Sequence, residues 1–482
     1  MKLMDNQKRL GEEKIPKLLI SFSIPAIIGM IVNTLYNIID RIFIGNIPEV
    51  GNLAITGVGI TLPIMTIILG FGLLIGVGTS ARISIALGQG RKETAEKLLG
   101  NAVTLIIIAS IIITCLGLIF IDPILKAFGA SADTLVYAKD YIRIIFFGTI
   151  FSLGSVGLNH SIRSDGNPKV AMLSMLLGAG TNIILDPILI FGFNMGVKGA
   201  AIATITSQLI SAIWIFYYFT KGKSILKIKL PNLKLERHIV LSIFTIGMSP
   251  FAMQIAQSLV QVVANNSLKY YGGDMAIGAM TIISSISLMA TMPIVGINQG
   301  AQPIIGYNYG AKKYDRVRET LKYGVVVATL IVTLAFLLVE IFPNTIIQVF
   351  NNDPSLREMA IRGVRIYLFM LPIVGVQIIA SSYFQAIGKA KISMFLSLLR
   401  QVLILIPLIL LLPKLQLFEG LDGIWFAGAI SDFISTIIST TIFFVSVKHL
   451  KKKTASHTDD LDVTISKNNK LLYNEISADN SK

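Results

Sequence analysis

Twelve apolar segments, each about 20 residues or longer, take up most of this chain of 482 residues. A helix of about 20 apolar residues is long enough to cross the hydrocarbon core of a bilayer. A water-soluble core could not hold so much apolar sequence, and only 14% of the residues are charged, against about 25% in soluble domains. Membrane barrels use strands of roughly ten alternating residues instead. The sequence therefore predicts an all-α integral membrane protein with twelve transmembrane helices.

Basic residues gather in every second connection between these segments and near both ends of the chain. The predicted spans cover residues 16–44, 54–86, 98–121, 136–161, 168–194, 198–220, 239–268, 276–307, 319–342, 359–387, 391–413 and 422–447. Connections rich in Lys and Arg stay on the cytoplasmic side of a membrane, so we expect both termini to be cytoplasmic. This clustering also accounts for the net charge of +15 without a nucleic-acid partner. The expected partner surface is the lipid bilayer.

The two halves of the chain resemble each other at an offset of about 220 to 226 residues. Pro25 corresponds to Pro250, and the turn at Gly166 corresponds to the turn at Gly388. Each half holds six spans in the same orientation, so the repeats are parallel and related by an axis along the membrane normal, as in many transporters. We predict a cytoplasmic N-terminus (1–15), an N-lobe (16–220), a cytoplasmic inter-lobe linker (221–238), a C-lobe (239–449) and a disordered cytoplasmic tail (450–482).

Two carboxylates, Asp40 and Asp186, lie inside apolar spans of the N-lobe. A carboxylate at membrane depth costs roughly 2.5–3.5 kcal/mol on insertion scales, so it usually has a partner or a task. Asn182 precedes Asp186 by one helical turn and shares its face. Thr204 lies at a similar depth, roughly 8–12 Å below the outer face, although Thr206 is an alternative. These four residues, Asp40, Asn182, Asp186 and Thr204, form the predicted site for a coupling ion, H⁺ or Na⁺.

Pro187 follows Asp186 directly and removes a backbone donor, which frees carbonyl oxygens that can help to bind a cation. No other metal site and no cofactor beyond the coupling ion is expected. The lone Cys115 rules out a disulfide framework. We find no nucleophile or metal-ligand grouping typical of an enzyme, so we predict that the chain is not one.

Two further polar sets lie within the predicted spans of the C-lobe. Arg400 and Asp432 are on consecutive spans, and we predict a structural ion pair between them. Gln254, Gln257 and Gln261 are spaced three and four residues apart, so they face one way along a helix. They line either a cavity or a helix–helix contact with interhelical hydrogen bonds.

These features together resemble the multidrug and toxic compound extrusion (MATE) family, in its DinF-like, MepA-like branch. The resemblance rests on the twelve spans in two parallel halves, on Pro25 and Asp40 in span 1, and on Asn182, Asp186 and Pro187 in span 5. It implies efflux of organic, often cationic compounds by antiport with H⁺ or Na⁺ across the bacterial plasma membrane, and a role in antibiotic resistance. It also implies that Asp40, Asn182, Asp186 and Thr204 carry the coupling and that the first helix bends at Pro25.

The NorM-like branch of the family places an acid in span 7, where this chain reads Gln257-Ser258-Leu259. That branch and its C-lobe cation site are therefore not expected here. A flippase of lipid-linked oligosaccharides is the alternative function, but it needs a basic cavity, and only Arg82 and Arg400 are candidates. A receptor or scaffold would leave the buried acids unexplained. Since one chain holds both lobes, we expect it to act as a monomer.

Overall fold

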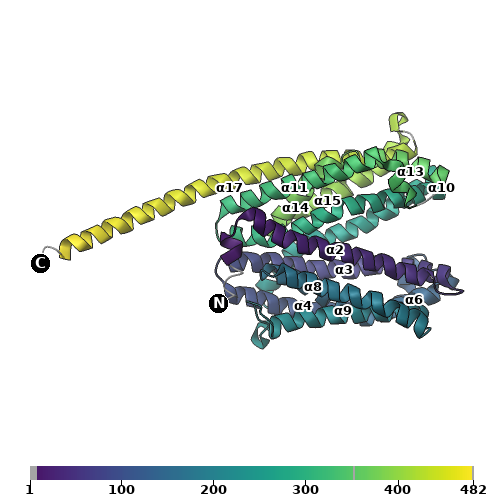
Figure 1. Cartoon of the computed structure of the whole chain (residues 1–482), viewed down its shortest axis with the longest axis horizontal. Helices are drawn as coiled ribbons and strands as arrows, with labels where there is room; N and C mark the ends of the chain where they lie inside the picture. The colour runs from purple at the N-terminus through teal and green to yellow at the C-terminus, as the bar shows by residue number, and fades with distance from the viewer. Residues whose placement is uncertain (1–7, 351–352, 419, 480–482) are drawn as a thin grey trace.

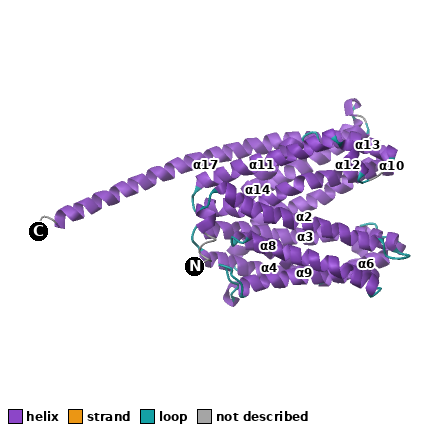
Figure 2. Ribbon diagram, viewed as in Figure 1, coloured by secondary structure: helices purple, strands orange, loops and turns teal. Residues whose placement is uncertain are grey.

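The computed structural model describes residues 8–350, 353–418 and 420–479, and the regular elements in these ranges are all helices (Figure 2). The first half contains α2 (Ile15–Gly45), α3 (Gly51–Gly88), α4 (Lys92–Ile119), α5 (Ile121–Ala127), α6 (Ala132–Phe147), α7 (Thr149–Ser164), α8 (Pro168–Pro187), η1 (Ile188–Gly192), α9 (Gly196–Thr220) and η2 (Leu230–Leu233). The second half contains α10 (Arg237–Gly310), α11 (Tyr314–Ile341), α12 (Pro343–Gln348), α13 (Pro354–Tyr367), α14 (Leu371–Ala386), α15 (Ala390–Leu398), η3 (Leu399–Leu405), α16 (Ile406–Leu411), η4 (Leu412–Lys414), η5 (Gln416–Phe418) and α17 (Leu421–Asp479).

The helices account for the twelve predicted spans. Among the described residues, nine helices are long and apolar enough to cross a membrane. One of them, α10, holds two predicted spans, because its backbone breaks at Gly273 (φ 64°, ψ −160°), a conformation that only glycine adopts readily. Two further spans consist of bent helix pairs, α6 with α7 (58°) and α13 with α14 (54°). Nine helices, the extra span of α10 and the two bent pairs make twelve.

Two apolar cores divide the helices into two lobes (Figure 1). One core joins α3 to α9, and the other joins the second half of α10 to α17. Helix α2 contributes to both cores, since Leu18 and Phe22 pack with the C-lobe whereas Ile44 packs with the N-lobe. Pro25 lies inside α2 among residues that pack on the C-lobe, since Phe22 precedes it and Ile27 follows it. The first helix therefore ties the two lobes together.

The lobes meet tightly at one end of the bundle, which we call the basic end because it carries the basic turns and the linker. Four glycines of α3 and α10 make this packing possible. A methyl group on Gly78 would overlap the carbonyl oxygen of Ile243, and one on Gly247 would overlap that of Leu74. Gly88 and Gly310 meet the partner backbone in the same way. Away from the basic end the lobes diverge (Figure 1).

The linker between the lobes is held against the N-lobe. The Thr104 hydroxyl donates to the carbonyl oxygen of Leu233 (2.7 Å), and Lys97 pairs with Glu236 (2.8 Å). Buried Asp165, in the turn between α7 and α8, accepts hydrogen bonds from Ser224 Oγ (2.9 Å) and from the backbone nitrogen of Leu226 (3.1 Å). Burial raises the pKa of Asp165 to about 6. The linker is thus part of the N-lobe surface up to the start of α10.

The last helix differs from the prediction. A disordered tail is expected from residue 450, but α17 continues as one helix to Asp479 and projects from the basic end (Figure 1). The sequence between residues 451 and 479 contains no Gly and no Pro, so nothing in it interrupts the backbone ladder of the helix. Residues 1–7 of the predicted N-terminus and 480–482 of the predicted tail lie outside the described residues.

Candidate functional site

The structure brings Asp40, Asn182 and Asp186 together inside the N-lobe. Asp40 lies one turn before the end of α2, and Asn182 and Asp186 lie in the last turns of α8, which packs along α2. All three side chains are buried. The Asn182 Nδ2 donates to Oδ1 of Asp186 at 3.4 Å, as expected for residues one helical turn apart.

The carboxyl groups of Asp40 and Asp186 lie close enough to interact electrostatically. Two ionised carboxylates close together in a buried site repel each other, so the pair favours a proton or a bound cation. Oδ1 of Asp40, Oδ2 of Asp186 and Oδ1 of Asn182 are buried and have no hydrogen-bond partner among the described residues. Buried polar oxygens are rarely left unpaired. A set of oxygen ligands of this kind suits a proton or a hard cation such as Na⁺.

Two tyrosines complete the surroundings of the carboxyl pair. Tyr36 of α2 and Tyr141 of α6 both lie close enough to Asp40 and Asp186 to interact with their charge. Tyr141 also interacts with the side chain of buried Thr204 on α9. Thr204 therefore reaches the site through Tyr141.

Sequence reasoning missed both tyrosines. Tyr36 precedes Asp40 by four residues, and this spacing on one helix could have identified it. No spacing links Tyr141 to the acids, because it reaches them from a different helix. The hydroxyl groups can bond to the carboxyl pair in its charged or its neutral form.

The backbone after Asp186 departs from α-helical geometry. Helix α8 ends at Pro187, and the five residues of η1 continue as a π-helix. A π-helical turn is frequent at functional sites and follows here from the missing donor of Pro187. In the C-lobe, η3 is also a π-helix and contains Arg400. Arg400 Nε donates to Oδ1 of Asp432, so these two residues form an ion pair buried within the C-lobe.

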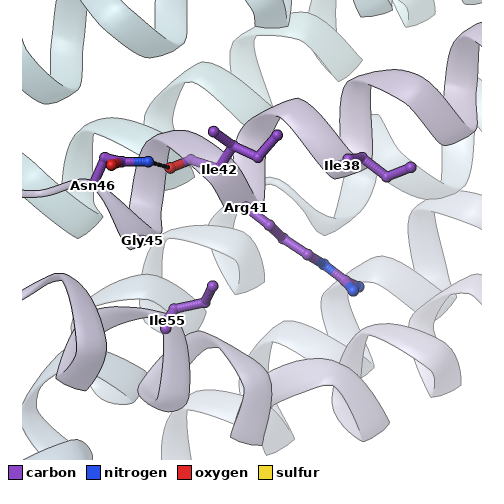
Figure 3. A pocket seen from close by; sticks show the side chains of 6 residues that line it. All are labelled: Ile38, Arg41, Ile42, Gly45, Asn46 and Ile55. Atoms are coloured by element: carbon purple, nitrogen blue, oxygen red, sulfur yellow. Dashed lines mark hydrogen bonds between the residues drawn. The ribbon is translucent and has the colours of Figure 1, made fainter. Parts of the chain in front are cut away.

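A pocket of about 460 Å³ lies between the end of α2 and the start of α3 (Figure 3). Three isoleucines, two of them exposed by half or more, supply its apolar walls. Arg41 extends beside them, and Asn46 Nδ2 donates to the carbonyl oxygen of Ile42 at 2.7 Å. The lining residues are Ile38, Arg41, Ile42, Gly45, Asn46 and Ile55.

The glutamine stripe lies on the first half of α10. Gln254 is half-buried beside Gly70 of α3, whereas Gln257 and Gln261 are exposed. The stripe thus starts at the contact between the lobes and continues where they diverge. Exposed amides inside a membrane span are costly against lipid, so this face suits water or a polar ligand.

Comparisons with known proteins agree with this architecture. The MatE family model matches residues 25–188 and 250–411, one segment in each lobe. The chain is 29% identical to the multidrug export protein MepA of Staphylococcus haemolyticus, over 90% of this chain and 94% of that protein. It is 28% identical to MepA of Staphylococcus aureus strain MRSA252, over 90% and 95%.

Solved structures are also similar. One is described as the outward-facing conformation of a multidrug resistance MATE family transporter of the MOP superfamily. It has a TM-score of 0.86 and 26% sequence identity, and the match covers 92% of this chain and 98% of that one. A MATE crystal structure in a bent conformation gives a TM-score of 0.87 at 25% identity, over 93% and 99%.

Proposed function

This chain belongs to the MatE family, and we propose that it exports organic, often cationic compounds from the cell in exchange for inward H⁺ or Na⁺. The observation that carries this proposal is that Asp40 and Asp186 are buried close together, where a proton or a cation would offset the repulsion between two carboxylates. The relatives named as multidrug export proteins support the same class of substrate. The expected location is the bacterial plasma membrane, with one chain acting as a monomer.

Coupling follows from the different states of the carboxyl pair. With a proton between them, Asp40 and Asp186 stay in contact and α2 stays packed on α8. With both ionised and no cation bound, like charges in a buried site repel and the contact is lost. Because α2 also packs on the C-lobe through Leu18 and Phe22, a movement of its outer half about Pro25 reaches both lobes. Linkage then requires that ion binding changes drug affinity, and drug binding changes ion affinity, by the same factor.

The positions of the basic residues indicate which end of the bundle faces the cytoplasm. The basic end is expected to face the cytoplasm, since Lys and Arg are retained there. With the lobes packed through glycines at that end, the arrangement corresponds to an outward-facing state. The exposed glutamines of α10 and the pocket at Arg41 then belong to the surface that releases substrate outside. Apolar walls with a few polar groups are typical of sites for organic ligands.

The test is ethidium efflux from proteoliposomes with a pH gradient or a Na⁺ gradient imposed separately. Efflux driven by one gradient would identify the coupling ion. Asp40→Asn and Asp186→Asn remove the charge with little change of shape, so gradient-driven efflux should fall to background. Asp133→Asn, at an exposed position at the start of α6, is the matched control and should transport normally. Unchanged efflux in both site variants would refute the coupling role.

A further inference from the structure

Arg163 is a buried cation at the basic end that the ion-coupling site does not use. It lies in the last turn of α7 and is only 3% exposed. Its Nη1 donates to Oε1 of Gln299, and its Nη2 contacts the sulfur of Met175 at 3.6 Å. Its Nε has no hydrogen-bond partner among the described residues. No carboxylate in the described part of the chain forms an ion pair with it.

Neutral partners alone, an amide oxygen and a thioether sulfur, are unusual for a buried guanidinium. Arg400, whose side chain is 23% exposed, has a carboxylate partner in Asp432. The carboxylate nearest to Arg163 in sequence, Asp165, accepts its hydrogen bonds from Tyr218, Ser224 and the linker backbone instead. A charge that is buried without a counter-charge is unfavourable and persists where it serves a purpose.

The contact of Arg163 with Gln299 crosses from one lobe to the other. Arg163 is on α7, whose residues Leu153, Leu158 and Ile162 belong to the N-lobe core. Gln299 is in the second half of α10, between Ile297 and Ala301 of the C-lobe core. The neighbouring Gly300 touches Ser23 of α2, so this contact lies where all three helices meet. Separation of the lobes at the basic end would therefore break it.

We propose that Arg163 is a positioning residue that holds the basic end closed by donating to Gln299, and that the missing counter-charge keeps this closure reversible. A hydrogen bond from a charged group to a neutral amide is weaker than a buried ion pair. When the lobes part, the guanidinium exchanges one amide for water and regains its hydration. The contact thus stabilises the closed arrangement without preventing the open one. This inference rests on the proposed transport cycle, in which the lobes alternate.

The distance between the lobes at the basic end reports the closure directly. Spin labels on Lys169→Cys and Lys391→Cys, both at exposed positions at the starts of α8 and α15, measure it by pulsed electron spin resonance of the full chain in nanodiscs. The single native cysteine is removed by Cys115→Ala. Arg163→Gln should move the closed-to-open ratio toward longer distances by about 10-fold, the effect of losing one charged hydrogen bond.

Gln299→Glu tests the same contact with the opposite sign. It gives Arg163 a counter-charge, so the lobes should separate less readily at the basic end. The distribution of spin-label distances should then narrow around the short distance, and ethidium efflux should slow. The exchange Arg163→Gln with Gln299→Arg rebuilds the contact and should restore the wild-type distribution. Arg91→Gln removes a basic charge from an exposed position at the same end and should change nothing.

Three outcomes test the proposed role of the contact between Arg163 and Gln299. Opposite shifts for Arg163→Gln and Gln299→Glu, with rescue by the exchange, support the proposal. Distributions that do not change, or that shift in the same direction, overturn it, even when the wild type responds to pH or Na⁺ and the transport proposal stands. If the shifts occur as expected but neither gradient drives efflux, the closure is supported and the proposed antiport fails.

Discussion

The buried pair of Arg400 and Asp432 offers the sharpest test of the energetics of this fold. Their side chains are 23% and 7% exposed, and Ser431 donates to the carbonyl oxygen of Arg400 at 2.9 Å. Asp432→Asn leaves the guanidinium buried without a counter-charge. Breaking a buried pair in this way costs about 3–5 kcal/mol. A domain of the size of the C-lobe loses roughly 2–4 °C of Tm per kcal/mol, so its Tm should fall by roughly 6–20 °C.

Replacement of both partners should behave differently. In Arg400→Met with Asp432→Leu, neither charge is buried, and apolar side chains of similar volume fill the space. Such replacements are often neutral or stabilising. The double variant should therefore melt close to the wild type and well above Asp432→Asn. This order separates the cost of an unpaired charge from the loss of packing.

The chain provides its own probe for this measurement. It contains two tryptophans, Trp214 in α9 of the N-lobe and Trp425, which is buried in the C-lobe core. With Trp214→Phe in all variants, fluorescence during heating reports the C-lobe alone. If Asp432→Asn melts at the wild-type Tm, the Arg400 charge is not buried away from water and the reasoning fails. A double variant that melts as low as Asp432→Asn would show that packing, not charge, is responsible.

Three further outcomes follow from the same structure. Arg41→Gln removes a positive charge from the pocket beside α3, and this charge repels a cationic substrate. The KM for ethidium efflux should therefore fall by about fivefold, the effect of roughly 1 kcal/mol from a unit charge about 10 Å away. The KM for a neutral substrate should not change. Gly247→Ala places a methyl group on the carbonyl oxygen of Leu74 and should destabilise the protein by about 1–3 kcal/mol or more in thermal melts, whereas Gly59→Ala, in open space, should not. Burial raises the pKa of Asp165 from 3.8 to about 6, so the folded state binds this proton more tightly than the unfolded chain does. The free energy of unfolding should therefore fall as the pH rises from about 4 to about 6. In thermal melts recorded below and above this pH range, Asp165→Asn should remove that pH dependence.

The sequence alone determined the membrane architecture of this protein. A span needs about 20 apolar residues with satisfied backbone groups, and this requirement is met within one segment, without reference to the rest of the chain. The twelve spans, the two parallel halves and the basic connections were therefore predictable. The bond between Asn182 and Asp186 was predictable too, because both residues lie on one turn of one helix. The helical course of α17 beyond residue 450 was not, since polar composition alone indicated disorder there.

Only the tertiary structure decided which helices meet and by which faces. Asp40 interacts with Asp186 across 146 positions of the chain (186 − 40), and Tyr141 approaches them from a third helix. Arg163 meets Gln299 across the boundary between the lobes, and α2 belongs to both cores. These contacts depend on the rotation and crossing of packed helices. Close packing of small residues such as Gly78 and Gly247 sets that rotation, and its effect extends over the whole interface rather than one segment.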